Sequence, residues 1–132
     1  MRRMFELPPE DIEFLEAKGF KWETIVENGQ QWLIICDYPI PIGYNENLVA
    51  LAINVDSGYP IAPLDMVYCF PQICRKDGKP INALAPHSLD SKNWQRWSRH
   101  RTAENPWRPG EDSICTHLLL AEEWFNRELH KN

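Results

Sequence analysis

Proline distribution is the feature that most limits what this chain can fold into. Eleven prolines are scattered along the 132 residues. Proline breaks helix interiors, so this density predicts a turn-rich mixture of helix and strand rather than a helical bundle. Apolar residues make up 43% and charged residues 25% of the chain, which excludes a disordered or collagen-like protein. We expect one domain over residues 1–132, large enough to bury a core without disulfides.

Residue patterning predicts one short helix followed by four strands. Residues 7–19 begin with prolines and acids and end at Gly19, as a short helix does. Residues 20–26 and 30–37 have strand patterns, and Asn28-Gly29 between them is a strong hairpin signal. Two further strands are expected, and they cover residues 48–55 and 66–70.

The second half of the chain is predicted to be mostly irregular before a final helix. No long periodic segment appears in residues 72–109, and such stretches are often functional when they occur in a compact domain. Asp112 or Ser113 can then cap a helix that runs to about Leu129. An apolar stripe at helical spacing supports this helix; it consists of Ile114, Leu118, Ala121, Phe125 and Leu129.

Charge is unevenly distributed along the chain. The net charge is −5, with −7 in residues 1–66 and +2 in residues 67–132. A general nucleic-acid binder is usually basic overall, so this class is disfavoured. The basic stretch of residues 92–108, in which tryptophans alternate with arginines, keeps nucleic-acid binding as a less favoured alternative.

Cysteine usage and the absence of targeting signals indicate the compartment. The four cysteines have no metal-finger spacing, so we expect free thiols, no metal and no cofactor. The N-terminal residues do not resemble a signal peptide, and no apolar run approaches the ~20 residues of a membrane span. The expected location is therefore the reducing cytoplasm.

Three motifs in a fixed order carry a family resemblance. The first is a connection rich in proline, with a glycine at its end, at residues 38–43, between the second and third expected strands. An apolar strand at residues 48–55 is followed by Tyr59-Pro60 and Pro63, and then by a strand at residues 66–70 that ends in an aromatic. Trp107-Arg108-Pro109 follows before the final helix. In this order the motifs resemble the ubiquitin-conjugating enzyme (UBC) fold, and the chain is most similar to its divergent bacterial branch, prokaryotic E2 family E.

The resemblance implies both a fold and a set of partners. The implied fold is α+β and UBC-like, with an N-terminal helix, a four-stranded antiparallel meander, a long irregular active-site segment and a C-terminal helix. The implied function is conjugation of a bacterial ubiquitin-like protein. The implied partners are that modifier and an adenylating enzyme. Trp107 and Pro109 are expected to support the active-site segment, and Trp107-Arg108-Pro109 is expected to lie near the turn at residues 59–63.

The expected nucleophile position holds no cysteine. In the family that cysteine lies about eight residues before the tryptophan of Trp-x-Pro, which here is Arg99, between Ser98 and His100. A hydroxyl needs a base to become a nucleophile, so Ser98 with His100 as base is one candidate for acyl transfer through an oxyester. The alternative is a non-catalytic variant that binds and positions the modifier.

The remaining candidate residues surround this pair. Four residues are candidate partner contacts for an acidic surface: Arg96, Trp97, Arg99 and Arg101. The plain alternative is a solvated loop that the tryptophans hold against the body of the protein. His117 lies in the final helix and is expected to support the loop, either facing the active-site segment or bonded to loop backbone.

Overall fold

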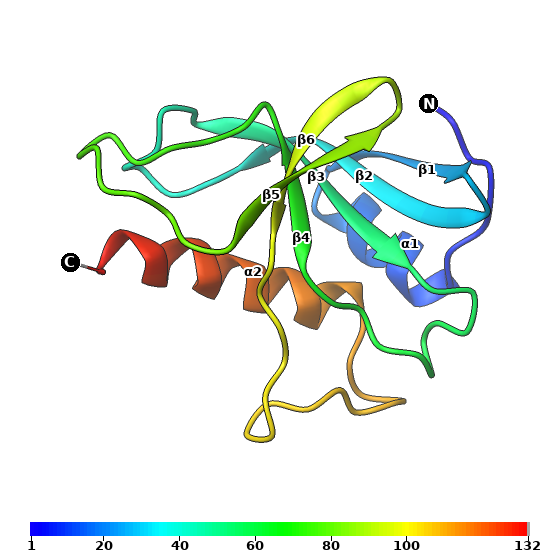
Figure 1. Cartoon of the computed structure of the whole chain (residues 1–132). Helices are drawn as coiled ribbons and strands as arrows, with labels where there is room; N and C mark the ends of the chain where they lie inside the picture. The colour runs from blue at the N-terminus through cyan, green and yellow to red at the C-terminus, as the bar shows by residue number, and fades with distance from the viewer. Residues whose placement is uncertain (132) are drawn as a thin grey trace.

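A six-stranded antiparallel sheet carries two helices (Figure 1). The computed structural model describes residues 1–131. The elements in chain order are α1 (Pro9–Ala17), β1 (Lys21–Glu27), β2 (Gln30–Pro39), β3 (Leu48–Val55), β4 (Val67–Phe70), β5 (Leu84–Leu89), β6 (Lys92–Trp97) and α2 (Ile114–Leu129).

The predicted four-stranded meander is confirmed. Strands β1 to β4 pair in sequence order, each antiparallel to the next. Asn28 and Gly29 form the first hairpin turn with φ values of 51° and 75°, the left-handed pair that a two-residue turn requires. Strand β2 continues beyond its predicted end to Pro39, because a register shift with Asp37 at φ 52° precedes its last two residues.

The expectation of an irregular segment over residues 72–109 is wrong in its middle. Strands β5 and β6 form a hairpin there, and the sheet order is β1-β2-β3-β4-β6-β5. The turn residues Asp90 and Ser91 have φ values of 53° and 60°. Because neither is glycine, the turn carries no strong sequence signal although both residues adopt the left-handed conformation. The irregular segment is therefore reduced to the stretch after Trp97.

The main core lies between the sheet and the helices. Helix α2 runs beneath the sheet in Figure 1 and begins, as predicted, after Ser113, whose N–H donates to Thr116 Oγ1 at 2.9 Å. Leu118, Ala121 and Phe125 are buried from α2, and Leu15 is buried from α1. Each large apolar side chain buried in this way contributes roughly 1.5–3 kcal/mol. Within residues 1–131, neither helix has the length and hydropathy to cross a membrane.

A second, smaller core covers the opposite face of the sheet. Its buried residues are Ile25, Trp32, Ile34, Ala52, Tyr68, Leu89 and Trp94. The ring of His87 packs against both Trp32, at 5.3 Å, and Tyr68, at 4.9 Å. Residues of β1 and β2 therefore meet residues of the β5–β6 hairpin, although β3 and β4 separate these strands in the sheet.

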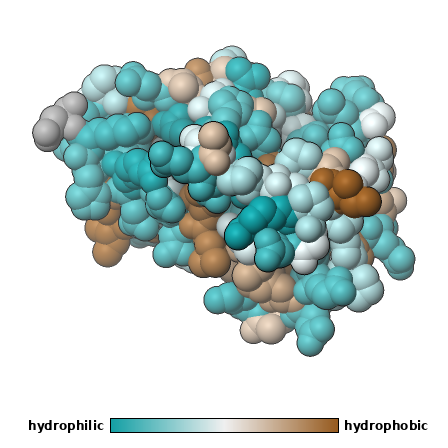
Figure 2. Space-filling view, turned by 90° about the horizontal axis from the view of Figure 1, so that it is seen from below, coloured by the Kyte–Doolittle hydropathy of each residue, from teal (hydrophilic) through white to brown (hydrophobic). Residues whose placement is uncertain are grey.

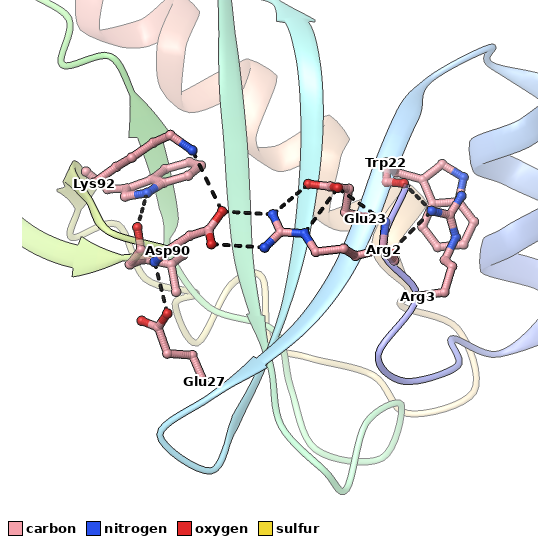
Figure 3. Close-up of polar contacts among 9 residues, drawn as sticks. Arg2, Arg3, Trp22, Glu23, Glu27, Asp90 and Lys92 are labelled. Carbon is pink, nitrogen blue, oxygen red and sulfur yellow. Dashed lines mark hydrogen bonds and ion pairs between the residues drawn. The ribbon is translucent and has the colours of Figure 1, made fainter.

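Polar contacts from the N-terminal residues connect the edge strand β1 with the β5–β6 hairpin at the opposite edge of the sheet (Figure 3). The Arg2 guanidinium donates to Glu23 of β1 at 2.9 Å and to Asp90 of the β5–β6 turn at 2.8 Å. The Asp90 N–H in turn donates to Glu27 Oε1 at 3.0 Å. The hydrogen bonds from Arg2 lower the pKa of both its carboxylate partners. These contacts position the β5–β6 hairpin, which leads into the candidate site.

Candidate functional site

The candidate site is the loop that follows β6. Trp97 ends the strand and is 0% exposed. The Ser98 N–H donates to Ala83 O at 3.0 Å, and the Arg99 N–H donates to Trp97 O at 2.9 Å. The second bond closes a tight turn centred on Ser98, so the backbone is bent there. Side chains two residues apart point to the same side only in an extended segment, so this rule does not place Ser98 beside His100.

His100 is paired with a carboxylate that sequence reasoning did not find. Its Nδ1–H donates to Asp65 Oδ2 at 2.8 Å, from side chains that are 59% and 44% exposed. Asp65 lies 35 positions earlier in the chain, so only the tertiary fold brings it to the loop. With Nδ1 engaged, Nε2 is the ring atom that can accept a proton, as in a base oriented by an acid.

Ser98 and His100 are close in sequence but are not joined in the structure. Within residues 1–131 no hydrogen bond connects the Ser98 side chain with the His100 ring. A hollow of about 350 Å³ lies between the loop and α2, with His100 and Trp124 among its lining residues. This hollow gives space for a reacting group beside the imidazole.

Arg99 anchors the loop to the end of α2. Its Nη2 lies 3.0 Å from Glu128 Oε1, and its guanidinium lies 4.8 Å from the Trp97 ring centre. Glu128 is only 2% exposed, and the Arg99 side chain is 14% exposed. Lys131 Nζ lies 3.3 Å from the same Glu128 oxygen, so the buried carboxylate has two cationic partners.

Arg101 is buried even more completely. Its side chain is 9% exposed and packs 4.7 Å from the Trp107 ring centre, with Nη1 at 3.9 Å from Asp112 Oδ2. Burial lowers the pKa of Arg101, and the nearby carboxylates act in the opposite direction. Its Nη2 also donates to His117 Nδ1 at 3.3 Å. Both arginines therefore face the body of the protein rather than solvent.

His117 is a buried, neutral connection between α2 and β4. It is 0% exposed, and its Nε2–H donates to Met66 O at 2.8 Å. Burial lowers its pKa to about 4. With Nε2 donating to a carbonyl, Nδ1 is the acceptor for Arg101, which fixes the tautomer. The backbone that His117 contacts is that of the residue preceding β4, and its contact with the loop after β6 is made through the Arg101 side chain.

Trp107 lies beside the Tyr59–Pro60 turn, as the motif order predicted. Its Nε1–H donates to Pro60 O at 3.0 Å, and its ring centre lies 6.1 Å from that of Tyr59. The Tyr59 hydroxyl donates to Asp11 Oδ2 at 2.7 Å and accepts the Ile114 N–H at 2.9 Å. This turn thus connects α1, the loop and the start of α2. Pro109 is exposed and makes no such connection.

Two tryptophans and two arginines of the basic stretch of residues 92–108 face the body of the protein rather than solvent. Trp94 and Trp97 are both buried, so neither offers a face on which a base can stack. Arg99 and Arg101 are occupied by internal partners. The surface on the α2 side is predominantly hydrophilic, with hydrophobic residues in small separate patches (Figure 2). The geometry gives no support to the nucleic-acid alternative.

The cysteines lie outside the loop. Cys69 is 0% exposed, and burial raises its pKa, which makes its thiol unreactive. Cys36 and Cys115 are both partly exposed, and Cys74 is exposed. Burial also raises the pKa of Cys36. In the part of the chain that the structure describes, no group of three or more His, Cys, Asp or Glu residues is arranged to hold a metal ion.

Comparison with known proteins identifies the family. The family model described as Prokaryotic E2 family E matches residues 7–128. No match was found among curated proteins or among solved structures. The match confirms the resemblance that the Tyr-Pro and Trp-x-Pro motifs indicated, and the α+β architecture agrees with it. The chain belongs to prokaryotic E2 family E, and its general role is of the ubiquitin-conjugation type.

Proposed function

We propose that this protein acts in the conjugation of a bacterial ubiquitin-like protein received from an adenylating enzyme, with His100 as the base of the reacting segment. The observation that carries the proposal is the hydrogen bond of 2.8 Å from His100 Nδ1 to Asp65 Oδ2. A carboxylate at Nδ1 orients the imidazole and keeps Nε2 available for a proton. We place this chemistry in the cytoplasm, where the four free cysteines stay reduced.

Ser98 is the proposed acyl acceptor. In the first step the Ser98 Oγ–C bond forms with the activated C-terminal carboxyl of the modifier, the carrier group leaves, and the hydroxyl proton passes to His100 Nε2. In the second step a target amine attacks the ester carbonyl, an amide forms, and Ser98 regains its proton. The serine must first rotate toward His100, because no hydrogen bond joins the two side chains in residues 1–131.

A second candidate is a non-catalytic variant that binds and orients the modifier. The observation that favours it is the rigid attachment of the loop through the buried Arg99–Glu128 pair and through Arg101. In this case Trp97 supports the docking surface from inside, while the exposed part of the loop contacts the partner. Such a protein needs neither a nucleophile nor a base.

Reconstitution separates the two candidates. The chain is incubated with ATP, a bacterial adenylating enzyme and a bacterial ubiquitin-like protein. If Ser98 accepts the acyl group, the adduct survives thiol reductants and breaks in mild hydroxide, since an oxyester resists thiol exchange. Ser98→Ala then abolishes the adduct, while Ser57→Ala, a change in an exposed turn, retains it. An intact adduct in Ser98→Ala rejects the serine mechanism.

Replacement of His100 tests the base separately. His100→Gln is expected to slow adduct formation by roughly 10²–10⁴-fold, the range for general base catalysis. The matched control is His130→Gln, at the exposed end of α2. The binding-only candidate predicts no adduct in any variant and unchanged modifier binding in Ser98→Ala. An unchanged rate of adduct formation in His100→Gln would reject His100 as the general base.

A further inference from the structure

Arg96 differs from every other arginine that the structure describes. It is the one arginine within residues 1–131 whose guanidinium has no hydrogen bond or ion pair. The partnered arginines are Arg2, Arg3, Arg75, Arg99, Arg101, Arg108 and Arg127. The Nε atom of Arg96 is buried and has no partner. Buried donors are nearly always satisfied, so an arginine in this state requires an explanation.

Sheet geometry places Arg96 on the face opposite the helices. It lies on β6 between Tyr68 of β4 and Ala85 of β5. Trp94, two positions earlier on the same face, belongs to the second core, as does Tyr68. Ala85 carries only a methyl group and is too short to cover the guanidinium. Because Nε is the only enclosed atom of this group without a partner, Nη1 and Nη2 remain in contact with solvent.

Tyr68 adds a second unpartnered donor beside Arg96. Its side chain is 5% exposed, yet its hydroxyl has no hydrogen-bond partner in residues 1–131 and is not enclosed. Burial raises the pKa of Tyr68, and the charge of Arg96 acts in the opposite direction, which places the guanidinium near the phenol. The phenol therefore keeps its proton at neutral pH and can donate it in a hydrogen bond.

The surrounding charged and titratable groups leave Arg96 without an internal anion. Asp65 acts on the Tyr68 phenol, and its carboxylate is hydrogen-bonded to His100 at 2.8 Å rather than to Arg96. The His87 ring packs against Tyr68 and has no hydrogen bond in the described residues. The Arg96 guanidinium and the Tyr68 hydroxyl therefore offer several hydrogen-bond donors at one place on the sheet, and no acceptor of the protein occupies them.

We propose that Arg96 and Tyr68 form a binding site for an oxyanion, a carboxylate or phosphate group. Nη1 and Nη2 donate to two oxygens of the group, and the Tyr68 hydroxyl donates a third hydrogen bond. Planar two-oxygen ligands match the guanidinium geometry and form its strongest hydrogen bonds. This site lies on the sheet face away from α2, and it does not depend on acyl transfer at Ser98.

Nitrogen-15 NMR of the arginine Nε–H groups tests the proposal on the whole chain. Sodium phosphate and sodium acetate are titrated separately, against sodium chloride at the same ionic strength. The Arg96 signal, assigned through Arg96→Lys, should shift saturably with an oxyanion and not with chloride. A response to both oxyanions indicates a general carboxylate or phosphate site, whereas a response to phosphate alone restricts the ligand to phosphate. The signal of exposed Arg108 is the internal control.

Two substitutions complete the test. Arg96→Lys keeps the positive charge but loses the two-pronged guanidinium and its Nε–H signal, so its phosphate affinity, measured by calorimetry, should fall about tenfold, whereas Arg127→Lys on α2 should leave the affinity unchanged. Tyr68→Phe should weaken binding roughly threefold by removing one donor. The proposal is overturned if the Arg96 signal of the wild type moves no more than that of Arg108, or if chloride produces the same shift. That comparison needs only the wild-type protein, so a variant that fails to fold does not weaken it.

Discussion

His117 makes the stability of the fold depend on pH. The imidazole is fully buried, and its pKa falls from an ordinary value of 6.5 to about 4 because burial disfavours the charged form. Between these values the unfolded chain binds the proton and the folded protein does not, so the free energy of unfolding decreases as the pH is lowered. One pKa unit corresponds to about 1.4 kcal/mol, so the complete shift costs about 3 kcal/mol.

His117→Gln isolates this contribution. A glutamine amide can still donate to Met66 O but does not titrate. Urea unfolding between about pH 7 and pH 4.5 should show the wild type losing 2 to 3 kcal/mol more than the variant, by the linkage arithmetic. Carboxylates titrate in both proteins and cancel in the difference. His130→Gln, which changes an exposed histidine, should retain the wild-type pH dependence.

Parallel stability curves for the wild type and His117→Gln would refute this reasoning. They would mean that His117 is protonated in the folded protein as readily as in the unfolded chain. The hydrogen bond that Nδ1 accepts from Arg101 would then be absent, because a protonated ring has no acceptor.

Three further predictions concern stability and the nucleophile. Arg75 is 5% exposed and donates hydrogen bonds to three carbonyls at the C-terminal end of α2. Arg75→Ala should therefore lower the free energy of unfolding in urea by about 2–4 kcal/mol, and a decrease below about 0.5 kcal/mol would contradict the role of Arg75 as a cap of α2. Tyr59→Phe leaves buried Asp11 without its donor and should cost about 1–3 kcal/mol, and an unchanged midpoint would show that this contact contributes nothing. Replacing all four cysteines with serine should reduce stability, mainly through the loss of buried Cys69, but should leave modifier transfer intact. Loss of transfer in a folded single variant, such as Cys74→Ser, would instead identify that cysteine as the nucleophile.

Local sequence signals predicted much of the fold. The Asn28-Gly29 turn, the proline-limited first helix and the Ser113 start of α2 each depend on residues within a few positions of one another. The proximity of Trp107 to Pro60 came from motif order alone. These features are predictable because local backbone preferences and the overall fold favour the same structure.

The features that sequence reasoning missed depend on contacts between distant segments. The β5–β6 hairpin turns at Asp90 and Ser91, which carry no glycine signal. The inward orientation of Arg99 follows from Glu128, 29 positions later, so a charge that reads as solvated becomes part of a buried pair. No periodicity or motif in the chain reveals such a partner.

Asp65 is the residue of the candidate site that sequence alone could not identify. It lies in the connection before β4, and its role depends entirely on the position of the loop after β6. Ser98 and His100 became candidates because the spacing of the family's nucleophile from Trp-x-Pro gave their place in the chain. The acid that orients the imidazole has no equivalent sequence marker.

The rate of adduct formation in Asp65→Asn tests the central claim most directly. If Asp65 orients His100 as the base, single-turnover transfer of the modifier should slow by roughly tenfold or more, because an amide no longer fixes the ring with Nε2 free to accept a proton. Asp37→Asn, at an exposed position of β2 with φ 52° that asparagine tolerates, should transfer at the wild-type rate. Equal rates in Asp65→Asn and Asp37→Asn would contradict the assignment of His100 and Asp65 as the reacting pair.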